Sequence, residues 1–118
     1  MRYAEVVIIG GGPAGMAAAL AARQAGAREV VIIEREACLG GILEQCIHNG
    51  FGLHRFHEEL TGPEYAERYE NMVREQHITC LCDTMVIDLS ADRRVTAVNQ
   101  KDGYFQIEAG AVVLARGC

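Results

Sequence analysis

The chain opens with two short apolar runs on either side of an alanine-rich segment. Residues 5–9 and 29–34 are dominated by valine and isoleucine, which is typical of strands buried on both faces of a parallel sheet. Between them, residues 13–25 begin with proline, are rich in alanine and precede Gly26, a pattern that predicts a closely packed helix. Strand, helix and strand within about thirty residues make a βαβ unit, so we expect two parallel strands joined by a right-handed crossover.

The second half of the chain carries a second helix pattern and several short strand patterns. Residues 35–62 are irregular and rich in glycine. Thr61 with Glu64 three positions later forms the pattern of a capping box, which predicts a helix running to about Gln76. Apolar runs then predict a short strand at 78–82, a three-stranded antiparallel meander at 85–89, 95–99 and 104–108, and a last buried strand at 111–115. The predicted fold is α/β, a Rossmann-like parallel sheet with helices and an inserted antiparallel β-meander.

Composition narrows the class of protein. With 118 residues, half of them hydrophobic, the chain is long enough for one domain with its own core. The net charge of −5 argues against a nucleic-acid-binding surface, which normally needs a basic excess. Glycines and a proline at 10–13 interrupt the first apolar stretch, which argues against a secretory signal peptide or a membrane span there. With five cysteines and no secretory context, we expect a cytoplasmic protein with free thiols.

The segment between the first strand and the first helix has the spacing Gly-x-Gly-x-x-Gly. In this context Gly10 permits the tight turn, Gly12 lets a diphosphate approach the backbone, and Gly15 lets the helix pack against the strand. The helix N-terminus then presents free N–H groups and a partial positive charge to the phosphates. We therefore expect the diphosphate of a dinucleotide to be held by Gly10, Gly12, Pro13, Ala14 and Gly15. A glycine-rich loop that merely turns is the alternative.

Glu34 ends the second predicted strand. A carboxylate at this place can accept hydrogen bonds from both ribose hydroxyls of an adenosine, and its charge would repel the 2′-phosphate of NADP. The neighbouring Arg35 is the one residue that argues in favour of NADP. A solvated carboxylate at the strand end is the alternative role for Glu34. These residues alone do not separate FAD from NAD.

Glu34 is followed six residues later by the glycine pair Gly40-Gly41. At this point the sequence resembles the flavoproteins with two dinucleotide-binding domains, the glutathione-reductase and thioredoxin-reductase superfamily. The resemblance implies FAD as the cofactor, with Arg35, Gly40 and Gly41 beside the adenosine. It also implies that the backbone of Val86 meets the adenine.

The last residues of the chain follow the same superfamily pattern. Leu114-Ala115-Arg116-Gly117 matches a hydrophobic strand that ends in Ala-Thr-Gly, with Arg116 in place of the usual threonine. The resemblance implies that Ala115, Arg116 and Gly117 line the flavin side of the site. We expect the replacement of threonine by Arg116 to affect the local contacts of the flavin loop and not the fold.

Residues 41–54 are similar to a bacterial subgroup of this superfamily. The subgroup comprises FAD-dependent oxidoreductases grouped with anaerobic glycerol-3-phosphate dehydrogenase, opine oxidase and hydrogen-cyanide synthase subunits. Disulphide reductases of the glutathione-reductase type carry two cysteines after the glycine pair, at positions that Leu43 and His48 occupy here. We therefore expect no dithiol chemistry of that type.

Two further groups of residues invite a functional interpretation. The first, whose spacing fits no standard zinc pattern, consists of Cys46, His48, His54 and His57. We expect no metal there, and a polar loop near the flavin or the substrate and ordinary loop packing are the alternatives. Cys80 and Cys82 alternate within a predicted strand, so we expect two small buried side chains on one face and not a redox pair.

Together these features predict that residues 1–118 form an FAD-binding domain, the N-terminal piece of a longer flavin-dependent oxidoreductase and inactive by itself. The resemblance implies that the intact enzyme passes a hydride or electrons between a small substrate or NAD(P)H and an acceptor, with NAD(P) bound in a second domain. A partner subunit is a further expectation, and no general acid or base is assigned. The alternatives are an NAD-binding dehydrogenase domain and a non-catalytic nucleotide-binding module.

Overall fold

The computed structural model of the chain describes residues 2–37, 39 and 62–115, with side chains described from residue 67 onward in the second helix. Its elements in chain order are β1 (Arg2–Ile9), α1 (Pro13–Gln24), β2 (Val30–Ile33), α3 (Gly62–Glu75), β3 (Thr79–Leu81), β4 (Met85–Leu89), β5 (Arg94–Asn99) and β6 (Gly103–Leu114). These bounds lie within a few residues of the predicted ones, with one exception in β6. The proposed cap at Thr61 lies outside the described residues.

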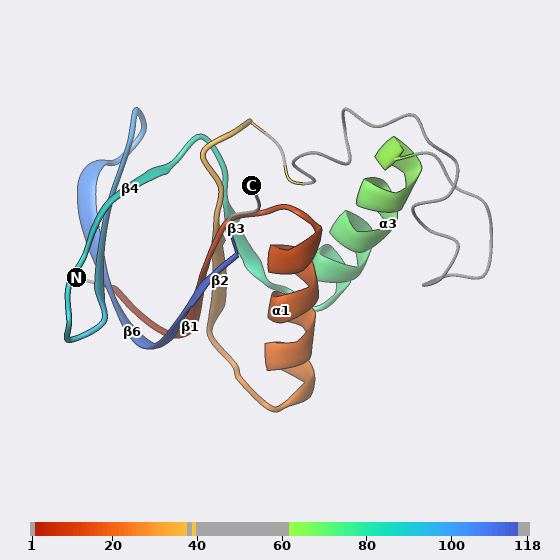
Figure 1. Ribbon diagram of the computed structural model, residues 1–118, viewed down its shortest axis with the longest axis horizontal. Coiled ribbons are helices and arrows are strands. Elements are labelled where there is room, and N and C mark those ends of the chain that lie inside the picture. Colours follow the sequence, from red (N-terminus) through yellow and green to blue (C-terminus); the bar gives the residue numbers. More distant parts are fainter. Residues whose placement is uncertain (1, 38, 40–61, 116–118) are drawn as a thin grey trace.

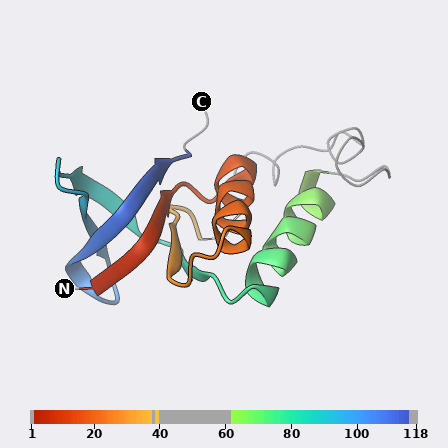
Figure 2. The same ribbon diagram turned by 90° about the horizontal axis from the view of Figure 1, so that it is seen from below.

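All six strands join one mixed sheet with the order β3-β2-β1-β6-β5-β4. β1 pairs in parallel with β2 and with β6, and β2 pairs in parallel with β3. β5 pairs antiparallel with both β6 and β4. The two helices lie together on one side of the parallel strands, and the antiparallel strands lie on the other side (Figures 1 and 2). The predicted α/β class with a Rossmann-like parallel sheet is confirmed.

The parallel strands are buried on both faces because their alternate residues enter two different clusters. Ile8 and Ile32 pack with α1 and α3 in the first cluster. Val7 and Ile33 pack with residues of β5 and β6 in the second. Since side chains alternate across a strand, each face of β1 and β2 contributes apolar area, which explains the unbroken valine and isoleucine runs.

The last strand differs from the prediction. Residues 104–108 and 111–115 are not separate strands, because β6 is one strand of 12 residues. Its first half pairs with β5 up to Glu108, and its second half pairs with β1 from Ile107 to Leu114. A Cβ at Gly110 would lie 2.7 Å from the carbonyl oxygen of Glu5. The small residue at this position therefore serves close pairing with β1 and does not break the strand.

The meander folds back over the parallel strands. β3 and β4 occupy opposite ends of the strand order, although only residues 82–84 separate them in the sequence. Asp83 has a φ of 52°, which produces the sharp change of direction between the two strands. Val86 of β4 then packs against the second cluster. The meander thus becomes the third layer of the molecule.

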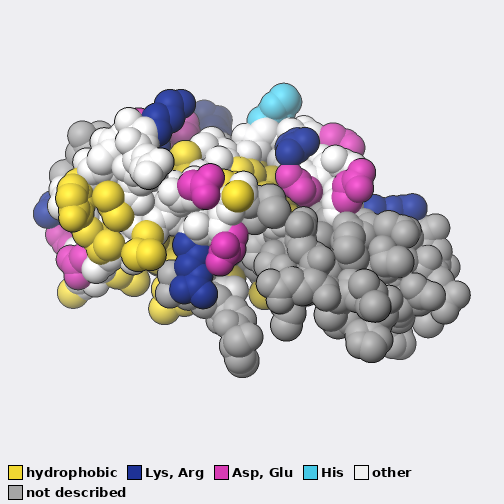
Figure 3. Space-filling model, turned by 90° about the horizontal axis from the view of Figure 1, so that it is seen from above, with side chains coloured by type: hydrophobic (Ala, Val, Ile, Leu, Met, Phe, Trp, Pro, Cys, Tyr) yellow, Lys and Arg dark blue, Asp and Glu magenta, His cyan; other side chains and the backbone are white. Residues whose placement is uncertain are grey.

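Among the described residues, no helix is both long enough and apolar enough to cross a membrane. At the end of the molecule formed by the meander, apolar side chains gather on the surface (Figure 3). The large exposed ones on these strands are Met85, Ile87, Leu89 and Tyr104. They lie in the layer farthest from the two helices.

Both helices end in the same backbone motif, with different residues at its strained position. After α1, Gly26 has a φ of 105° and donates its N–H to the carbonyl of Arg23. After α3, His77 has a φ of 58° and donates its N–H to the carbonyl of Arg74. Each is the left-handed residue of a Schellman motif, which glycine adopts without strain.

We expect His77→Gly to raise the free energy of unfolding by about 0.5–1 kcal/mol, because the left-handed strain exceeds the added entropy of glycine in the unfolded chain. The matched change Gly26→Ala should lower the free energy of unfolding by about 1 kcal/mol, since no atom lies within 4 Å of the added Cβ and only the backbone strain counts. Urea denaturation measures both. A destabilised His77→Gly variant would contradict this account of the helix end.

Candidate functional site

The turn between β1 and α1 is tight, and its own backbone requires glycine at two positions. Gly10 has a φ of 117° and donates its N–H to the carbonyl of Ile33 at 2.9 Å, which ties the turn to β2. A Cβ at Gly15 would lie 1.8 Å from the carbonyl oxygen of Gly10. The first turn of α1 therefore approaches the end of β1 more closely than any side chain allows.

Gly12 is different, because nothing in the described protein requires a glycine there. Its φ of −76° and ψ of −169° are extended values that any residue adopts. Among residues 2–37, 39 and 62–115, no atom lies within 4 Å of a Cβ built at this position. Gly12 is also the N-cap residue of α1, and no side chain caps the first turn of that helix, which begins at Pro13 and contains no acidic residue. A glycine facing open space thus lies beside an uncapped helix N-terminus.

The Glu34 carboxylate connects this turn to the segment after β2. Its Oε1 accepts a hydrogen bond of 2.7 Å from the N–H of Gly11, and its Oε2 accepts one of 2.8 Å from the N–H of Glu36. Glu34 is only 7% exposed. It is therefore not the solvated strand-end carboxylate that was the alternative role.

Gly11 has little room for a side chain because of this contact and its surroundings. A Cβ at Gly11 would lie 2.5 Å from Cδ2 of Leu39 and 3.1 Å from Oε1 of Glu34. Leu39 is itself buried in the cluster that includes α1. The side chains of Leu39 and Glu34 therefore pack against the backbone of Gly11 at the end of β2. This packing holds the Glu34 carboxylate beside the glycine turn.

The main chain at Glu34 is fixed from the other side by β3 and the residues after it. The N–H of Glu34 donates to the carbonyl of Leu81 at 2.8 Å, and its carbonyl accepts from the N–H of Thr84 at 3.0 Å. The N–H of Asp83 donates to the carbonyl of Glu36 at 2.8 Å. The turn after β2 and the turn after β3 are thereby held in a defined backbone conformation.

The structure brings part of the predicted site together at the carboxyl ends of the parallel strands (Figure 1). The N–H of Ala115, which follows β6, donates to the carbonyl of Ile9 at the end of β1. Arg35 is exposed, and its Nε lies 4.0 Å from Oε1 of Glu36. Val86 lies on the inner side of β4, half-buried against the second cluster. The predicted site residues that lie outside the described residues are Gly40, Gly41, Arg116 and Gly117.

Sequence reasoning did not assign a role to Gly11, Leu39 or Thr84. The three consecutive glycines at 10–12 were a signal that Gly11 is also constrained. Leu39 precedes the glycine pair, and nothing in its pattern distinguishes it from an ordinary core residue. Thr84 lies between two predicted strands, where its backbone partner could not be identified from the sequence.

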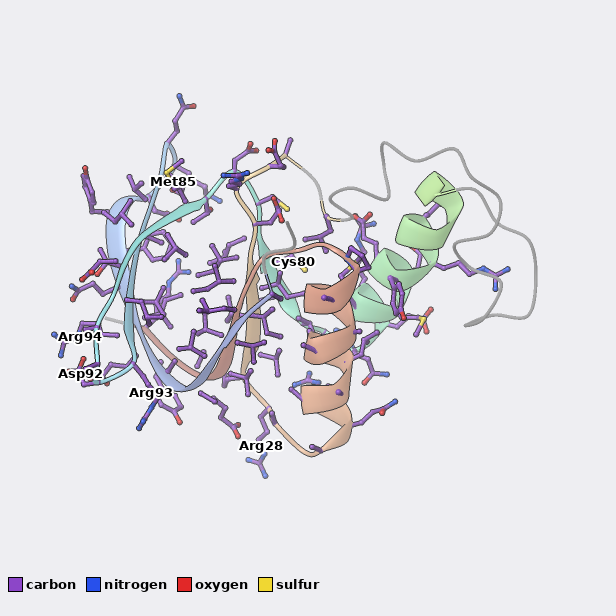
Figure 4. The ribbon with its side chains drawn as sticks, in the orientation of Figure 1. Arg28, Cys80, Met85, Asp92, Arg93 and Arg94 are labelled. Carbon is purple, nitrogen blue, oxygen red and sulfur yellow. The ribbon has the colours of Figure 1, made fainter. Side chains whose placement is uncertain are left out.

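Cys80, labelled in Figure 4, and Cys82 are both partly buried against the cluster beneath α1 and α3, which agrees with the prediction of two side chains on one face. Burial raises the pKa of the Cys80 thiol; Glu70 adds to the rise and Arg74 opposes it. A raised thiol pKa lowers the fraction of reactive thiolate at neutral pH. Cys80 thus has the properties of a small packed side chain.

No group of three or more metal-ligating side chains occurs within residues 2–37, 39 and 62–115. The predicted absence of a metal at Cys46, His48, His54 and His57 concerns residues outside the described ones. That prediction therefore stays untested.

Comparison with known proteins gives a family match over nearly the whole chain. Residues 4–118 match the family described as pyridine nucleotide-disulphide oxidoreductase. Hydrogen cyanide synthase subunit HcnB of Pseudomonas protegens is 29% identical over 95% of this chain and 24% of that protein. The chain therefore spans about a quarter of the length of this curated relative.

Solved structures share the fold. L-proline dehydrogenase from P. horikoshii is 30% identical, with a TM-score of 0.78 over 98% of this chain and 22% of that chain. Thioredoxin reductase from Streptococcus pyogenes MGAS5005 is 23% identical, with a TM-score of 0.74 over 96% of this chain and 35% of that chain. In both, the similar region is a minor part of a longer polypeptide.

Alanine substitutions should separate the glycines that the fold requires from the one that it does not. We expect Gly15→Ala to lower the free energy of unfolding by about 1–3 kcal/mol, because the new Cβ collides with the Gly10 carbonyl. We expect Gly12→Ala to change it by less than about 0.5 kcal/mol. Urea denaturation of the two variants measures the difference, and equal losses would contradict the open space at Gly12.

Proposed function

Because this chain belongs to the pyridine nucleotide-disulphide oxidoreductase family, we propose that it forms the FAD-binding domain of a flavin-dependent oxidoreductase. The family and the fold indicate an oxidoreductase that binds FAD. The observation that carries the proposal to particular residues is Gly12, beside which the described part of the chain leaves open space at the N-terminus of α1. A diphosphate beside this backbone would explain a glycine that neither conformation nor packing requires.

The residues at the turn fit an adenine dinucleotide. Gly10, Gly12, Pro13, Ala14 and Gly15 would hold its diphosphate, with the uncapped N–H groups of α1 as donors and the helix dipole favouring the negative charge. A diphosphate site is expected to have space beside the backbone that a Cβ would fill, as at Gly12.

Glu34 has the capacity to hold the ribose. An ionised carboxylate offers about four acceptor positions, and the backbone N–H groups of Gly11 and Glu36 use one on each oxygen. The remaining positions can accept the two ribose hydroxyls. In this proposal Glu34 has two tasks, since it orders the glycine turn and contacts the nucleotide.

The remaining assignments rest on the resemblance to the superfamily. Arg35, Gly40 and Gly41 would flank the adenosine, and the backbone of Val86 would meet the adenine. Ala115, Arg116 and Gly117 would line the flavin side, where the hydrogen bond from Ala115 to Ile9 fixes the end of β6 beside the end of β1.

When bound, FAD would supply the redox chemistry, the transfer of a hydride or electrons between a substrate and an acceptor. The residues of this chain bind the cofactor, orient it and order the loops around it. Leu43 and His48 occupy the positions of the paired thiols of glutathione-reductase-type enzymes, so we do not propose disulphide reduction.

We further propose that the domain is the N-terminal part of a longer enzyme in which a second domain binds NAD(P). The similar region covers 22–35% of the relatives named above, which supports this arrangement. The bacterial subgroup predicted from residues 41–54, together with a partner subunit, is supported by the similarity to a protein named as a subunit of hydrogen cyanide synthase.

Gly12→Val should weaken FAD binding by at least about tenfold, because the branched side chain fills the space assigned to the diphosphate. Fluorescence titration with FAD measures the affinity, and urea denaturation of the same variant should show a stability close to that of the parent. Unchanged FAD affinity in the folded variant would contradict the role of the glycine turn. A parent chain that binds NAD and not FAD would instead support the dehydrogenase alternative.

Glu34→Ala should lower the affinity for FAD by about 1.5–3 kcal/mol for each lost ribose hydrogen bond. It should also lower the free energy of unfolding by about 1–3 kcal/mol, because the N–H groups of Gly11 and Glu36 lose their acceptors.

Glu34→Gln is the milder variant, since its single carboxamide oxygen still accepts one backbone N–H. FAD titration and urea denaturation on both variants separate the two tasks of Glu34. A loss of stability without any loss of affinity would leave Glu34 as a structural residue only.

A further inference from the structure

A chain of hydrogen bonds runs from the β5–β6 turn to the Glu34 carboxylate. Asn99, the last residue of β5, donates from Nδ2 to Oγ1 of Thr84 at 3.1 Å. The N–H of Thr84 donates to the carbonyl of Glu34 at 3.0 Å. Glu34 in turn accepts the N–H of Gly11 through Oε1 at 2.7 Å. We propose that Thr84 and Asn99 are positioning residues that hold Glu34 in the geometry needed to bind the ribose.

Thr84 is the centre of this connection. It is only 1% exposed, and its hydroxyl donates to the carbonyl of Cys82 at 2.9 Å while accepting from Asn99. The donor and one acceptor position of the hydroxyl are therefore used in a buried setting, where an unsatisfied group would be costly. These bonds leave Thr84 a single side-chain orientation, with its main-chain N–H directed at Glu34.

Asn99 has a fixed orientation as well. Its Oδ1 accepts the N–H of Asp102 at 2.6 Å, so its Nδ2 is the group directed at Thr84. Asn99 pairs with Gly103 where the β5–β6 hairpin turns. The amide side chain thus joins the hairpin turn to the segment between β3 and β4.

The topology explains why side chains are needed for this connection. β3 and β4 lie at opposite ends of the strand order, so no sheet pairing joins them among the described residues. The bonds of Thr84 to Asn99 and to Glu34 attach the meander to the end of β2 instead. If they are lost, the main chain at Glu34 keeps its bond to Leu81 but loses its restraint on the meander side.

This inference rests on the proposed function, because it assigns Thr84 and Asn99 a role in binding the adenosine ribose. Glu34 would accept from the 2′-hydroxyl only when its carboxylate is held at the correct distance and angle. ADP and 2′-deoxy-ADP differ in that hydroxyl alone. The ratio of their dissociation constants therefore reports how well Glu34 is positioned. A change in overall stability alone does not alter this ratio.

The test uses Thr84→Val, which keeps the shape of threonine and removes the hydroxyl, with Thr84→Ser as the conservative variant. Thr96→Val is the matched control, since Thr96 on β5 accepts a hydrogen bond of 3.4 Å from Gln106 on the exposed side of the meander. Calorimetric titration with ADP and with 2′-deoxy-ADP is carried out on the parent and the three variants. Amide NMR spectra of the ligand-free proteins monitor the Gly11 N–H.

We expect the parent and Thr96→Val to prefer ADP over 2′-deoxy-ADP by roughly tenfold or more, the ratio given by one hydrogen bond to a charged group. Thr84→Val should reduce this ratio to about threefold or less and shift the Gly11 amide signal. Thr84→Ser should restore both properties.

Two results would overturn the inference in distinguishable ways. A parent that binds neither ADP nor FAD would refute the proposed function together with the inference. A parent that prefers ADP, with the same preference in Thr84→Val, would refute the positioning role alone. If Thr84→Val fails to fold, Asn99→Ala replaces it, because alanine can neither donate to the Thr84 hydroxyl nor accept from it. An unchanged ratio in Asn99→Ala would then refute the role.

Discussion

The structure depends on one carboxylate that holds two turns of the backbone together. Glu34 accepts the N–H of Gly11, from the turn before α1, and the N–H of Glu36, from the turn after β2. The two parallel strands pair along their length, and the hydrogen bond from Gly10 to Ile33 ties their ends, to which Glu34 adds its two contacts. A buried carboxylate that accepts two backbone N–H groups joins these ends with charge-assisted hydrogen bonds. This contact helps to fix the backbone conformation at the carboxyl ends of β1 and β2.

The same edge carries the attachment of the meander. Since β6 pairs with β1 on one side and β5 on the other, it leads the sheet from the parallel layer into the antiparallel one. The meander then returns over the parallel strands and buries their second face. Its contact with the end of β2 passes through Thr84 and Asn99. One continuous strand and one short chain of polar contacts are therefore among the connections between the layers.

The sequence predicted what depends on local patterns. The valine and isoleucine runs, the alanine-rich helix and the spacing of the glycines identified β1, α1 and β2 to within a few residues, because burial on both faces leaves a pattern in each element separately. The position of Glu34 at the end of β2 was also predictable. Its partner Gly11 was not, because that contact depends on how two distant turns approach each other.

The errors and omissions have similar causes. Two strands were predicted at 104–108 and 111–115, whereas β6 is continuous and passes close to β1 at Gly110. Thr84 and Asn99 are residue types common in turns, so nothing in their pattern distinguished a structural connection from an ordinary loop. Long-range contacts of single polar side chains leave no periodic signal, and the positioning of the site depends on such contacts.

The four glycines at positions 10, 11, 12 and 15 are present for two different reasons. Gly10, Gly11 and Gly15 are explained by the protein, through a positive φ, a close carboxylate and a close carbonyl. Gly10 and Gly15 would be needed in any crossover that turns this tightly, with or without a nucleotide, whereas Gly11 is crowded by the side chains of Glu34 and Leu39. Gly12 has no such explanation, since its backbone is ordinary and the space beside it is open. Two glycines of the motif, Gly10 and Gly15, therefore identify the fold, and the argument for a bound diphosphate depends on the third, Gly12.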